Sequence, residues 1–519
     1  MTATALHGAK PTASPFLITC SIMLATIMQA LDTTIANVAL PHMQGSLSAT
    51  QDQVAWVLTS YIVAAAIMTP PAGFLSAKLG RKRLFVWSVV GFTIASMLCG
   101  IAGTLEQMVL FRLLQGVFGA ALVPLSQAVL LDTYPREKHG AAMAMWGVGV
   151  MVGPILGPTL GGYLTEYYNW RWVFFINLPF GILALMGILA FVPETAHERD
   201  RPIDFFGFAL LSIAIGALQM MLDRGELKDW FSSPEIVAET VVAALAFYMF
   251  LVHMLTHEHP FITPRLFKDR NLVTGLFFIF LVGIVLLATM ALLPPFLQNL
   301  KGYPVITVGF VLAPRGVGTM IAMLVVGRLV GRVDTRLLIL FGLGLTAFSL
   351  WQMVQFNLNT DQYKIIESGI IQGFGLGFIF VPLSTITFST LDPRLRTEAA
   401  GLFSLLRNIG SSIGISVVTA LLAESTQINH SILSEHVTPF NPMMQWPQLP
   451  AMWSLDTPSG LAALDAEVTR QAATIAYLND FQFMMWVTLA AIPLLFLLRR
   501  PGASPRRGPS TSATAAALE

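Results

Sequence analysis

Apolar segments about as long as a lipid bilayer is thick recur along the whole 519-residue chain. A helix needs about 20 apolar residues to cross the hydrocarbon core, and a backbone in lipid can satisfy its own hydrogen bonds by becoming helical. Only 11% of the residues are charged, whereas soluble domains carry roughly 25%. The sequence therefore predicts an all-α membrane protein with about fourteen transmembrane helices. The predicted spans lie near 16–39, 54–75, 84–103, 107–130, 141–162, 172–192, 203–222, 235–256, 272–298, 305–331, 336–356, 364–389, 398–423 and 480–498.

Lysine and arginine are distributed unequally between the two sides of these predicted spans. Of the 30 basic residues, 21 fall in the even-numbered connections and the two tails, 6 near the odd-numbered connections and 3 inside spans. Basic residues collect on the cytoplasmic side of membrane proteins, so we expect both termini to be cytoplasmic. A missed or extra span would have destroyed this alternation, so the alternation also supports the number of spans. The formal net charge of +1 gives no reason to expect a nucleic acid partner.

Short motifs in the first half of the chain recur in the second half at an offset that drifts only slightly. The pairs are Gly73-x-Leu75-x-x-Lys78 with Gly327-x-Leu329-x-x-Arg332, Gln115-Gly116 with Gln372-Gly373, Pro124-Leu125-Ser126 with Pro382-Leu383-Ser384, and Gly153 and Gly157 with Gly410 and Gly414. Parallel repeats are typical of transporters that rock two halves about a central site. We therefore expect two six-helix bundles with two additional helices between them.

The repeat divides the chain into six expected parts. These are a cytoplasmic tail over 1–15, an N-terminal bundle over 16–192, two additional helices over 203–256, a C-terminal bundle over 272–498, a long periplasmic loop inside that bundle over 424–479, and a disordered cytoplasmic tail over 499–519. The long loop begins polar and proline-rich and ends in a helical pattern. The last tail is rich in Pro, Ser and Ala, a composition that cannot bury enough apolar surface to fold.

One acidic residue lies inside the first predicted span, in the run from Leu31 to Pro41. An Asp at bilayer depth costs roughly 2.5–3.5 kcal/mol even on lenient scales, so Asp32 is a candidate proton site or charge partner. Arg112 lies at a similar depth in the fourth span and is its expected partner. The repeat places uncharged residues, Val285 and Gly369, at the corresponding positions of the second half. The alternative is a buried ion pair that only orients two helices.

Two glycine-containing stretches are candidate conformational motifs. The fifth span carries glycines at a spacing of four, which allow a neighbouring backbone to approach closely, together with prolines that bend a helix. The alternative for these glycines is ordinary helix packing. The second connection is a short basic turn, which could also serve only as a topology anchor. The residues concerned are Gly149, Gly153, Pro154, Gly157 and Gly161 in the span, and Gly73, Gly80 and Arg81 at the turn.

Three further charged residues lie in spans of the second half. Arg315, Glu367 and Arg407 are candidates for a substrate cavity, with helix interfaces or snorkelling side chains as the alternative. His253, His257, Glu258 and His259 cluster at a helix end, but an interfacial location explains them without a metal. We predict no metal site, no cofactor and no enzymatic activity, since the sequence has no metal-ligand, nucleophile or Walker A pattern.

These motifs together resemble the major facilitator superfamily, and in particular its fourteen-span drug:proton antiporter branch. The run around Asp32 is similar to the first-helix signature of that branch, and Arg112-x-x-Gln115-Gly116 resembles its proton-coupling motif. Gly73 to Arg83 resembles the cytoplasmic loop motif of the superfamily. Ala77 stands where that motif usually has an Asp, so the salt bridge that this Asp forms in gating is not expected here. Gly149 to Gly162 resembles the fifth-helix motif of exporters.

The resemblance extends over nearly the whole chain to the EmrB-type inner-membrane subunits of tripartite efflux pumps. It implies a proton-coupled multidrug exporter of the bacterial inner membrane, with Asp32 and Arg112 as proton-coupling residues and Gln29 and Gln115 as further cavity candidates. It also implies small amphiphilic substrates, an EmrA-like periplasmic adaptor and a TolC-like outer-membrane channel. Two alternatives stay open: a narrow exporter of a siderophore or metabolite, and a membrane sensor that has lost transport.

Overall fold

The computed structural model describes residues 14–195, 202, 204–260, 262–445 and 453–498, and in this part of the chain every long element is a helix. Thirteen helices are long and apolar enough to cross a membrane, or fourteen if one bent pair is a single span. The all-α membrane fold is therefore confirmed. The α-helices are α1 (Pro15–Ser46), α2 (Gln51–Met68), α3 (Pro71–Leu79), α4 (Arg81–Ile101), α5 (Leu105–Gly119), α6 (Leu122–Thr133), α7 (His139–Tyr167), α8 (Trp172–Phe175), α9 (Asn177–Phe191), α10 (Phe205–Arg224), α11 (Pro234–Thr256), α12 (Arg270–Pro295), α13 (Val305–Leu329), α14 (Thr335–Val354), α15 (Gln362–Ser389), α16 (Arg396–Ser434) and α17 (Pro458–Ala490).

The second predicted span, 54–75, is broken rather than continuous. Its two parts, α2 and α3, meet at an angle of 57°. Pro70 and Pro71 lie at the junction, and neither can donate the backbone hydrogen bond that would continue α2. The break turns α3 toward the second half of the chain, where Gly73 lies so close to Glu398 that an added Cβ would stand 2.4 Å from its Cα.

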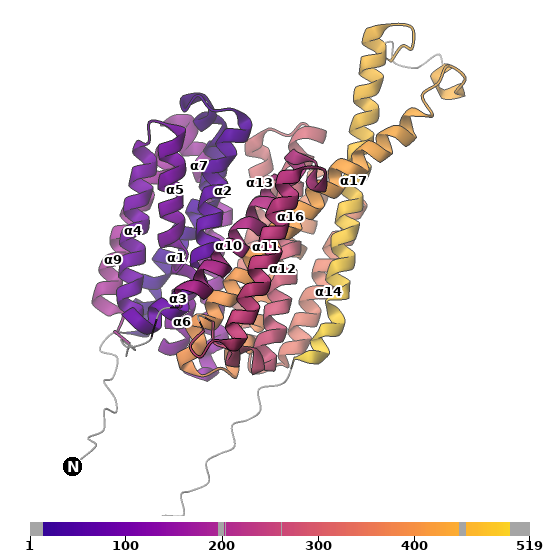
Figure 1. Ribbon diagram of the computed structural model, residues 1–519. Helices are drawn as coiled ribbons and strands as arrows, with labels where there is room; N and C mark the ends of the chain where they lie inside the picture. Colours follow the sequence, from indigo (N-terminus) through magenta and orange to yellow (C-terminus); the bar gives the residue numbers. More distant parts are fainter. Residues whose placement is uncertain (1–13, 196–201, 203, 261, 446–452, 499–519) are drawn as a thin grey trace, which may run out of the picture.

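The helices form two bundles with an additional pair between them (Figure 1). In the first bundle α1 packs against α7 and α9, while in the second α12 packs against α16, and α15 packs against α13 and α14. Helix α10 packs against α11 and also contacts α2 of the first bundle and α16 of the second. Two hydrogen bonds join α10 to α16, from Gln219 Nε2 to Ser412 Oγ (2.9 Å) and from Ser416 Oγ to the Leu222 carbonyl oxygen (2.7 Å).

The two ends of the helix bundle differ in shape. We call the end at which α1 begins and α17 ends the terminal face, and the opposite end the hairpin face (Figure 1). At the hairpin face α16 and α17 run on together as a projecting helical hairpin. Helix α16 has 39 residues and α17 has 33, whereas about 20 suffice to cross the bilayer core. The expected loop over 424–479 is therefore largely helical, through Ser434 and again from Pro458, with residues 446–452 outside the described part.

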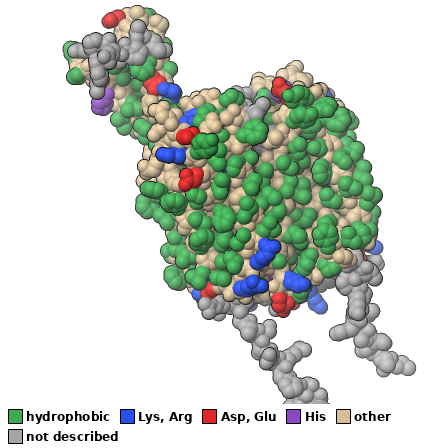
Figure 2. All heavy atoms as spheres, turned by 180° about the vertical axis from the view of Figure 1, so that it is seen from behind, with side chains coloured by type: hydrophobic (Ala, Val, Ile, Leu, Met, Phe, Trp, Pro, Cys, Tyr) green, Lys and Arg blue, Asp and Glu red, His purple; other side chains and the backbone are tan. Residues whose placement is uncertain are grey.

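The outside of the helix bundle is apolar between its two ends. Figure 2 shows hydrophobic side chains over the middle of one face, with Lys, Arg, Asp and Glu gathered toward the ends. Large apolar residues from the middle of separate helices are exposed there, including Leu245 of α11 at 57% and Ile321 of α13 at 51%. An apolar surface of this extent is favourable in contact with lipid tails and unfavourable in contact with water. The chain is thus a multi-pass membrane protein.

Candidate functional site

A buried ion pair lies at the centre of the first bundle. Asp32 comes from α1 and Arg112 from α5, and Arg112 Nη1 is 2.7 Å from Asp32 Oδ2. The side chains are 0% and 1% exposed, so water does not screen their attraction. The sequence predicted that these residues lie at similar depth, and the structure brings them into direct contact. Removing either partner would leave the other charge buried and uncompensated.

Two side-chain amides complete the shell around the Asp32 carboxylate. Gln115 Nε2 donates to Asp32 Oδ1 at 2.8 Å, and Asn177 Nδ2 donates to the same oxygen at 2.7 Å. Gln115 Oε1 in turn accepts a hydrogen bond from Arg112 Nη1 at 2.7 Å. Asp32 therefore joins α1 to α5 through Arg112 and Gln115, and to α9 through Asn177. We call these four residues the Asp32 cluster.

The Arg112 side chain is itself held in place by the second helix. Its Nε donates to the Val57 carbonyl oxygen at 3.0 Å, and its guanidinium carbon lies 4.4 Å from the centre of the Tyr61 ring. A cation over an aromatic face in a dry site is attracted to it. The Tyr61 hydroxyl accepts a hydrogen bond from Gln29 Nε2 at 3.1 Å, so Gln29 belongs to the outer shell of the cluster.

Sequence reasoning missed Asn177 and Tyr61. Asn177 is an amide inside an otherwise apolar span, and it also donates to Ser96 Oγ at 2.9 Å. A polar residue in such a span was the signal that could have singled it out. Tyr61 gave no comparable signal, because tyrosine in a span is most often an interfacial residue. Its role depends on α2 crossing α5, which only the fold reveals.

The glycine face of α7 packs against α1, the helix that carries Asp32. A Cβ at Gly153 would lie 2.4 Å from the Ala30 backbone, and one at Gly157 would lie 2.1 Å from Thr34 Oγ1. Thr34 Oγ1 also donates to the Gly153 carbonyl oxygen at 3.0 Å. The predicted close approach of a neighbouring backbone is confirmed. The other members of this face are Gly149 against Met23 and Gly161 against Ile35, with Pro154 in the same helix.

The same helix α7 touches the second bundle. A Cβ at Gly147 would meet Met323 Sδ at 2.6 Å, and one at Gly316 would meet Ile155 Cγ1 at 2.1 Å. Helix α7 therefore lies between α1 of the first bundle and α13 of the second. A displacement of α1 is transmitted to α13 through packed atoms, because such contacts have little free volume.

A three-residue ion network joins the two bundles at the terminal face. Arg81, at the start of α4, forms an ion pair with Asp132 of α6, and Arg396 Nη1 of α16 is 2.7 Å from the other oxygen of Asp132. Gly80 precedes Arg81 with φ of +89°, a conformation that favours glycine. Arg81, at the end of the predicted basic turn, thus takes part in an ion pair although Ala77 stands where the resemblance leads us to expect an Asp.

The charged candidates of the second half do not reach the Asp32 cluster. Arg315 of α13 is buried and its Nη2 donates to the Leu286 carbonyl oxygen at 3.4 Å, while Arg407 of α16 is half-buried with its Nη2 3.4 Å from Asn408 Oδ1. Among the described residues neither guanidinium has a carboxylate within ion-pair distance. Glu367 is exposed near the start of α15. The role of each of the three as a cavity residue stays a prediction.

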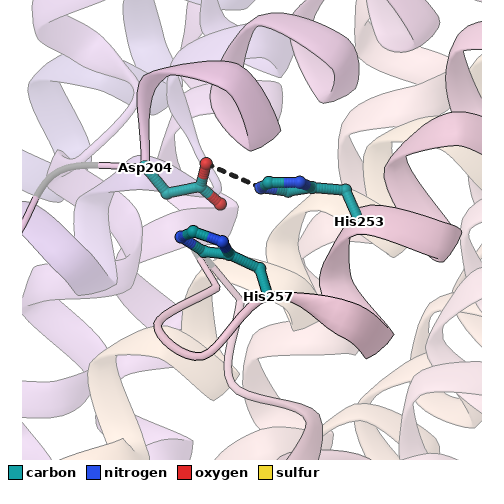
Figure 3. Close-up of side chains that lie close together, drawn as sticks. All are labelled: Asp204, His253 and His257. Atoms are coloured by element: carbon teal, nitrogen blue, oxygen red, sulfur yellow. Dashed lines mark hydrogen bonds and ion pairs between the residues drawn. The ribbon is translucent and has the colours of Figure 1, made fainter.

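The histidine cluster at the terminal face is organised by Asp204 (Figure 3). Asp204 Oδ1 lies 2.8 Å from His253 Nε2 and accepts the Gly207 N–H at 2.7 Å, so it caps α10 and ties it to α11. One ligand atom from each of Asp204, His253 and His257 lies within 4.8 Å of the others. Capping and pairing account for the arrangement without a metal, and the predicted absence of a metal stays a prediction.

Comparisons with known proteins support one family. The family model described as Major Facilitator Superfamily matches residues 22–415. Multidrug export protein EmrB of Escherichia coli (strain K12) is 38% identical over 494 residues, which cover 93% of this chain and 95% of that protein. Fatty acid resistance protein FarB of Neisseria gonorrhoeae is 36% identical over 487 residues, 93% of this chain and 96% of that protein.

A solved structure supports the same architecture. The crystal structure of the human organic anion transporter MFSD10 superposes with a TM-score of 0.59 and covers 92% of this chain and 100% of that one. The two sequences are 14% identical, so this likeness concerns the fold alone.

Proposed function

The chain belongs to the Major Facilitator Superfamily, and we propose that it is a multidrug efflux transporter that exchanges protons for small amphiphilic compounds. The observation that carries this proposal is the Asp32 cluster, a buried carboxylate whose partners come from two other helices. The names of the similar proteins EmrB and FarB, a multidrug export protein and a fatty acid resistance protein, support export as the activity.

Protonation of Asp32 is the proposed coupling step. A proton on the carboxyl removes the negative charge that Arg112 faces, and so weakens the bonds of α1 to α5 and α9. Because α7 packs on both α1 and α13, this loosening biases how the two bundles meet. The proton enters from outside and weakens cargo binding, and its release to the cytoplasm resets the site. The Arg81–Asp132–Arg396 network joins the two bundles at the terminal face in the present conformation.

The decisive test replaces Asp32 by an amide of the same shape. Reconstituted Asp32→Asn protein should lose cargo transport driven by an imposed pH gradient, while it still elutes as a folded, monodisperse species. Asp465→Asn is the matched control, since Asp465 is a 70% exposed carboxylate on the hairpin. Undiminished proton-driven transport by Asp32→Asn would remove this residue from the mechanism.

We propose a bacterial inner-membrane location with both termini in the cytoplasm and the hairpin in the periplasm. The distribution of Lys and Arg supports this orientation. The similarity to EmrB supports an EmrA-like adaptor and a TolC-like channel as partners. A photo-crosslinker at exposed Ile428 on α16 should capture an adaptor in cells that express one, whereas the same probe at Phe277 in the apolar belt should not. A reporter enzyme that is active only in the cytoplasm should be active when it is fused after residue 519. An inactive fusion would contradict the proposed orientation.

A second candidate concerns the chemistry of the cargo. Arg315 and Arg407 have no carboxylate partner among the described residues, which favours an amphiphile that carries an acidic group. The name of FarB supports such cargo. Arg315→Gln should weaken transport of a fatty acid by about tenfold, the effect of one charge-assisted bond, and spare a neutral dye. Equal loss for both cargoes would argue for a structural role.

Two rivals predict other outcomes in the same vesicles. An exporter with a narrow specificity for a siderophore or metabolite would transport only one compound from a panel of chemically unrelated compounds. A sensor that has lost transport would bind a compound without any proton flux. A panel of unrelated compounds with a pH-sensitive dye inside the vesicles separates all three.

A further inference from the structure

A second buried carboxyl lies in the C-terminal bundle, and the coupling step above does not use it. Asp480 of α17 is 1% exposed, and its Oδ2 has no hydrogen-bond partner. Its neighbours on the same helix, Tyr477 and Met484 one turn to either side and the adjacent Phe481, belong to a buried apolar cluster. Asp480 thus has the burial of Asp32 without its donors.

The helices packed against α17 provide no charge to neutralise Asp480. These are α12, α14 and α16. Tyr477 is the titratable neighbour on α17 itself. The charged or titratable residues of all four helices are Arg270 in α12, Arg336 in α14, Arg396, Glu398, Arg407, Glu424 and His430 in α16, and Asp465, Glu467 and Arg470 in α17. None of these described residues forms an ion pair with Asp480.

The position of Asp480 matches the place of the Asp32 cluster in the repeat. Helix α17 is the sixth span of the second half, as α9 with Asn177 is in the first. One turn beyond Asp480, Met484 Sδ is 3.6 Å from Thr289 Oγ1, which accepts a hydrogen bond from Gln372 Nε2 at 3.2 Å. Gln372 is the repeat counterpart of Gln115. Asp480 therefore lies one turn from the second half's equivalent of the cluster.

An ionised carboxylate in such surroundings needs a cation or several donors, and the described residues supply neither. A proton satisfies the same group without any rearrangement of the protein. We propose that Asp480 is a second proton-binding carboxyl of the transport cycle, so that each half of the molecule carries one coupled proton. The proposal rests on the proton-coupled export proposed above. It sets the number of protons per cargo molecule, which the Asp32 cluster alone leaves open.

The stoichiometry of transport tests this proposal. Vesicles containing wild-type protein, Asp480→Asn or the exposed neighbour Asn479→Ala are given a fixed pH gradient, and the limiting cargo gradient is measured. One proton less per neutral cargo molecule lowers that limiting gradient about tenfold for each pH unit applied. We expect this loss in Asp480→Asn, no change in Asn479→Ala, and recovery in Asp480→Glu. An unchanged gradient in Asp480→Asn would overturn the proposal.

The outcomes separate this proposal from the coupling step at Asp32. Asp32→Asn abolishes proton-driven transport, whereas Asp480→Asn still transports at a lower proton ratio. If both variants transport normally, proton coupling at Asp32 fails as well. If Asp480→Asn loses affinity for cationic cargo alone and keeps its proton ratio for neutral cargo, Asp480 is a cargo site and the proposal is wrong.

A measurement on the wild-type protein keeps the proposal testable if Asp480→Asn does not fold. Dicyclohexylcarbodiimide is an apolar reagent that modifies protonated carboxyl groups. Mass spectrometry should find it on Asp480 at low pH, with less modification as the pH rises through the working range, and not on exposed Asp465. Absence of modification at Asp480 at every pH would overturn the proposal.

Discussion

The two bundles share a backbone plan and differ in how their buried polar groups are partnered. In the first bundle the Asp32 carboxylate accepts three hydrogen bonds, from Arg112, Gln115 and Asn177. In the second, Arg315 and Asp480 are also buried and have no opposite charge beside them among the described residues. The repeat therefore conserves helix packing and not chemistry. We infer that the first bundle holds its ion pair until a proton reaches Asp32, whereas the buried groups of the second bundle receive their partners during transport.

The largest expected effect comes from breaking the pair in the first bundle. Arg112→Gln leaves the Asp32 charge without its cation and should lower the free energy of unfolding by about 3–5 kcal/mol. The double variant with Asp32→Asn removes both charges and should regain most of that stability, but not proton-driven transport. Thermal unfolding in detergent gives the coupling between the two sites. Simple additivity of the two losses would show that the pair is not a unit.

A smaller effect is expected where the two bundles are alike. Gly153 and its repeat counterpart Gly410 each face a neighbouring backbone, and an added Cβ would stand 2.4 Å from Ala30 and 2.2 Å from the Phe280 carbonyl oxygen, respectively. Gly153→Ala and Gly410→Ala should each cost about 1–3 kcal/mol through overpacking. The same thermal assay compares them, with Gly344→Ala as control because nothing lies near that position. A large loss for one variant only would mean that packing is not conserved between the bundles.

The contact between the bundles should respond more modestly. Arg396→Gln removes the bond from α16 to Asp132 and leaves the pair of Arg81 with Asp132 inside the first bundle. We expect the terminal face to open more often, and a cysteine introduced at buried Ala400 to react a few-fold faster with a polar maleimide. Arg394→Gln, an exposed neighbour, is the control. Equal reaction rates would show that packing alone keeps this face closed.

The smallest effect is expected at Asp204, His253 and His257. Chelators, and the substitution His257→Gln, should leave transport unchanged, because the capping of α10 depends on Asp204 and His253. Isothermal titration with Zn²⁺ should give the same result for the wild-type protein and for His257→Gln. Saturable zinc binding that this variant loses would place a metal between α10 and α11.

Much of the fold followed from local properties of the sequence. Apolar segments of bilayer length predicted the helices. Asp32 and Arg112 lie inside apolar spans at a similar depth, and this predicted that they are partners. Asn177 was missed although an amide in an apolar span was a visible signal, and only the crossing of α9 and α1 shows that its partner is Asp32. Asp480 was missed because it lies at the edge of a predicted span, while α17 begins 22 residues earlier, at Pro458. The break in the second span could have been predicted from the sequence. Pro70 and Pro71 are adjacent there, and two prolines in a row interrupt a helix.

The additional helix α10 has a mechanical consequence. It is attached to α2 of the first bundle by a hydrogen bond between Asp223 and Thr59, and to α16 of the second through Ser412 and Ser416. When the bundles tilt relative to each other near the hairpin face, α10 cannot remain attached to both. It must travel with one partner and slide along the other, so a tilt breaks the hydrogen bonds on one of its two sides. We infer that the inserted pair of helices adds a free-energy cost to each tilt, because those hydrogen bonds are lost.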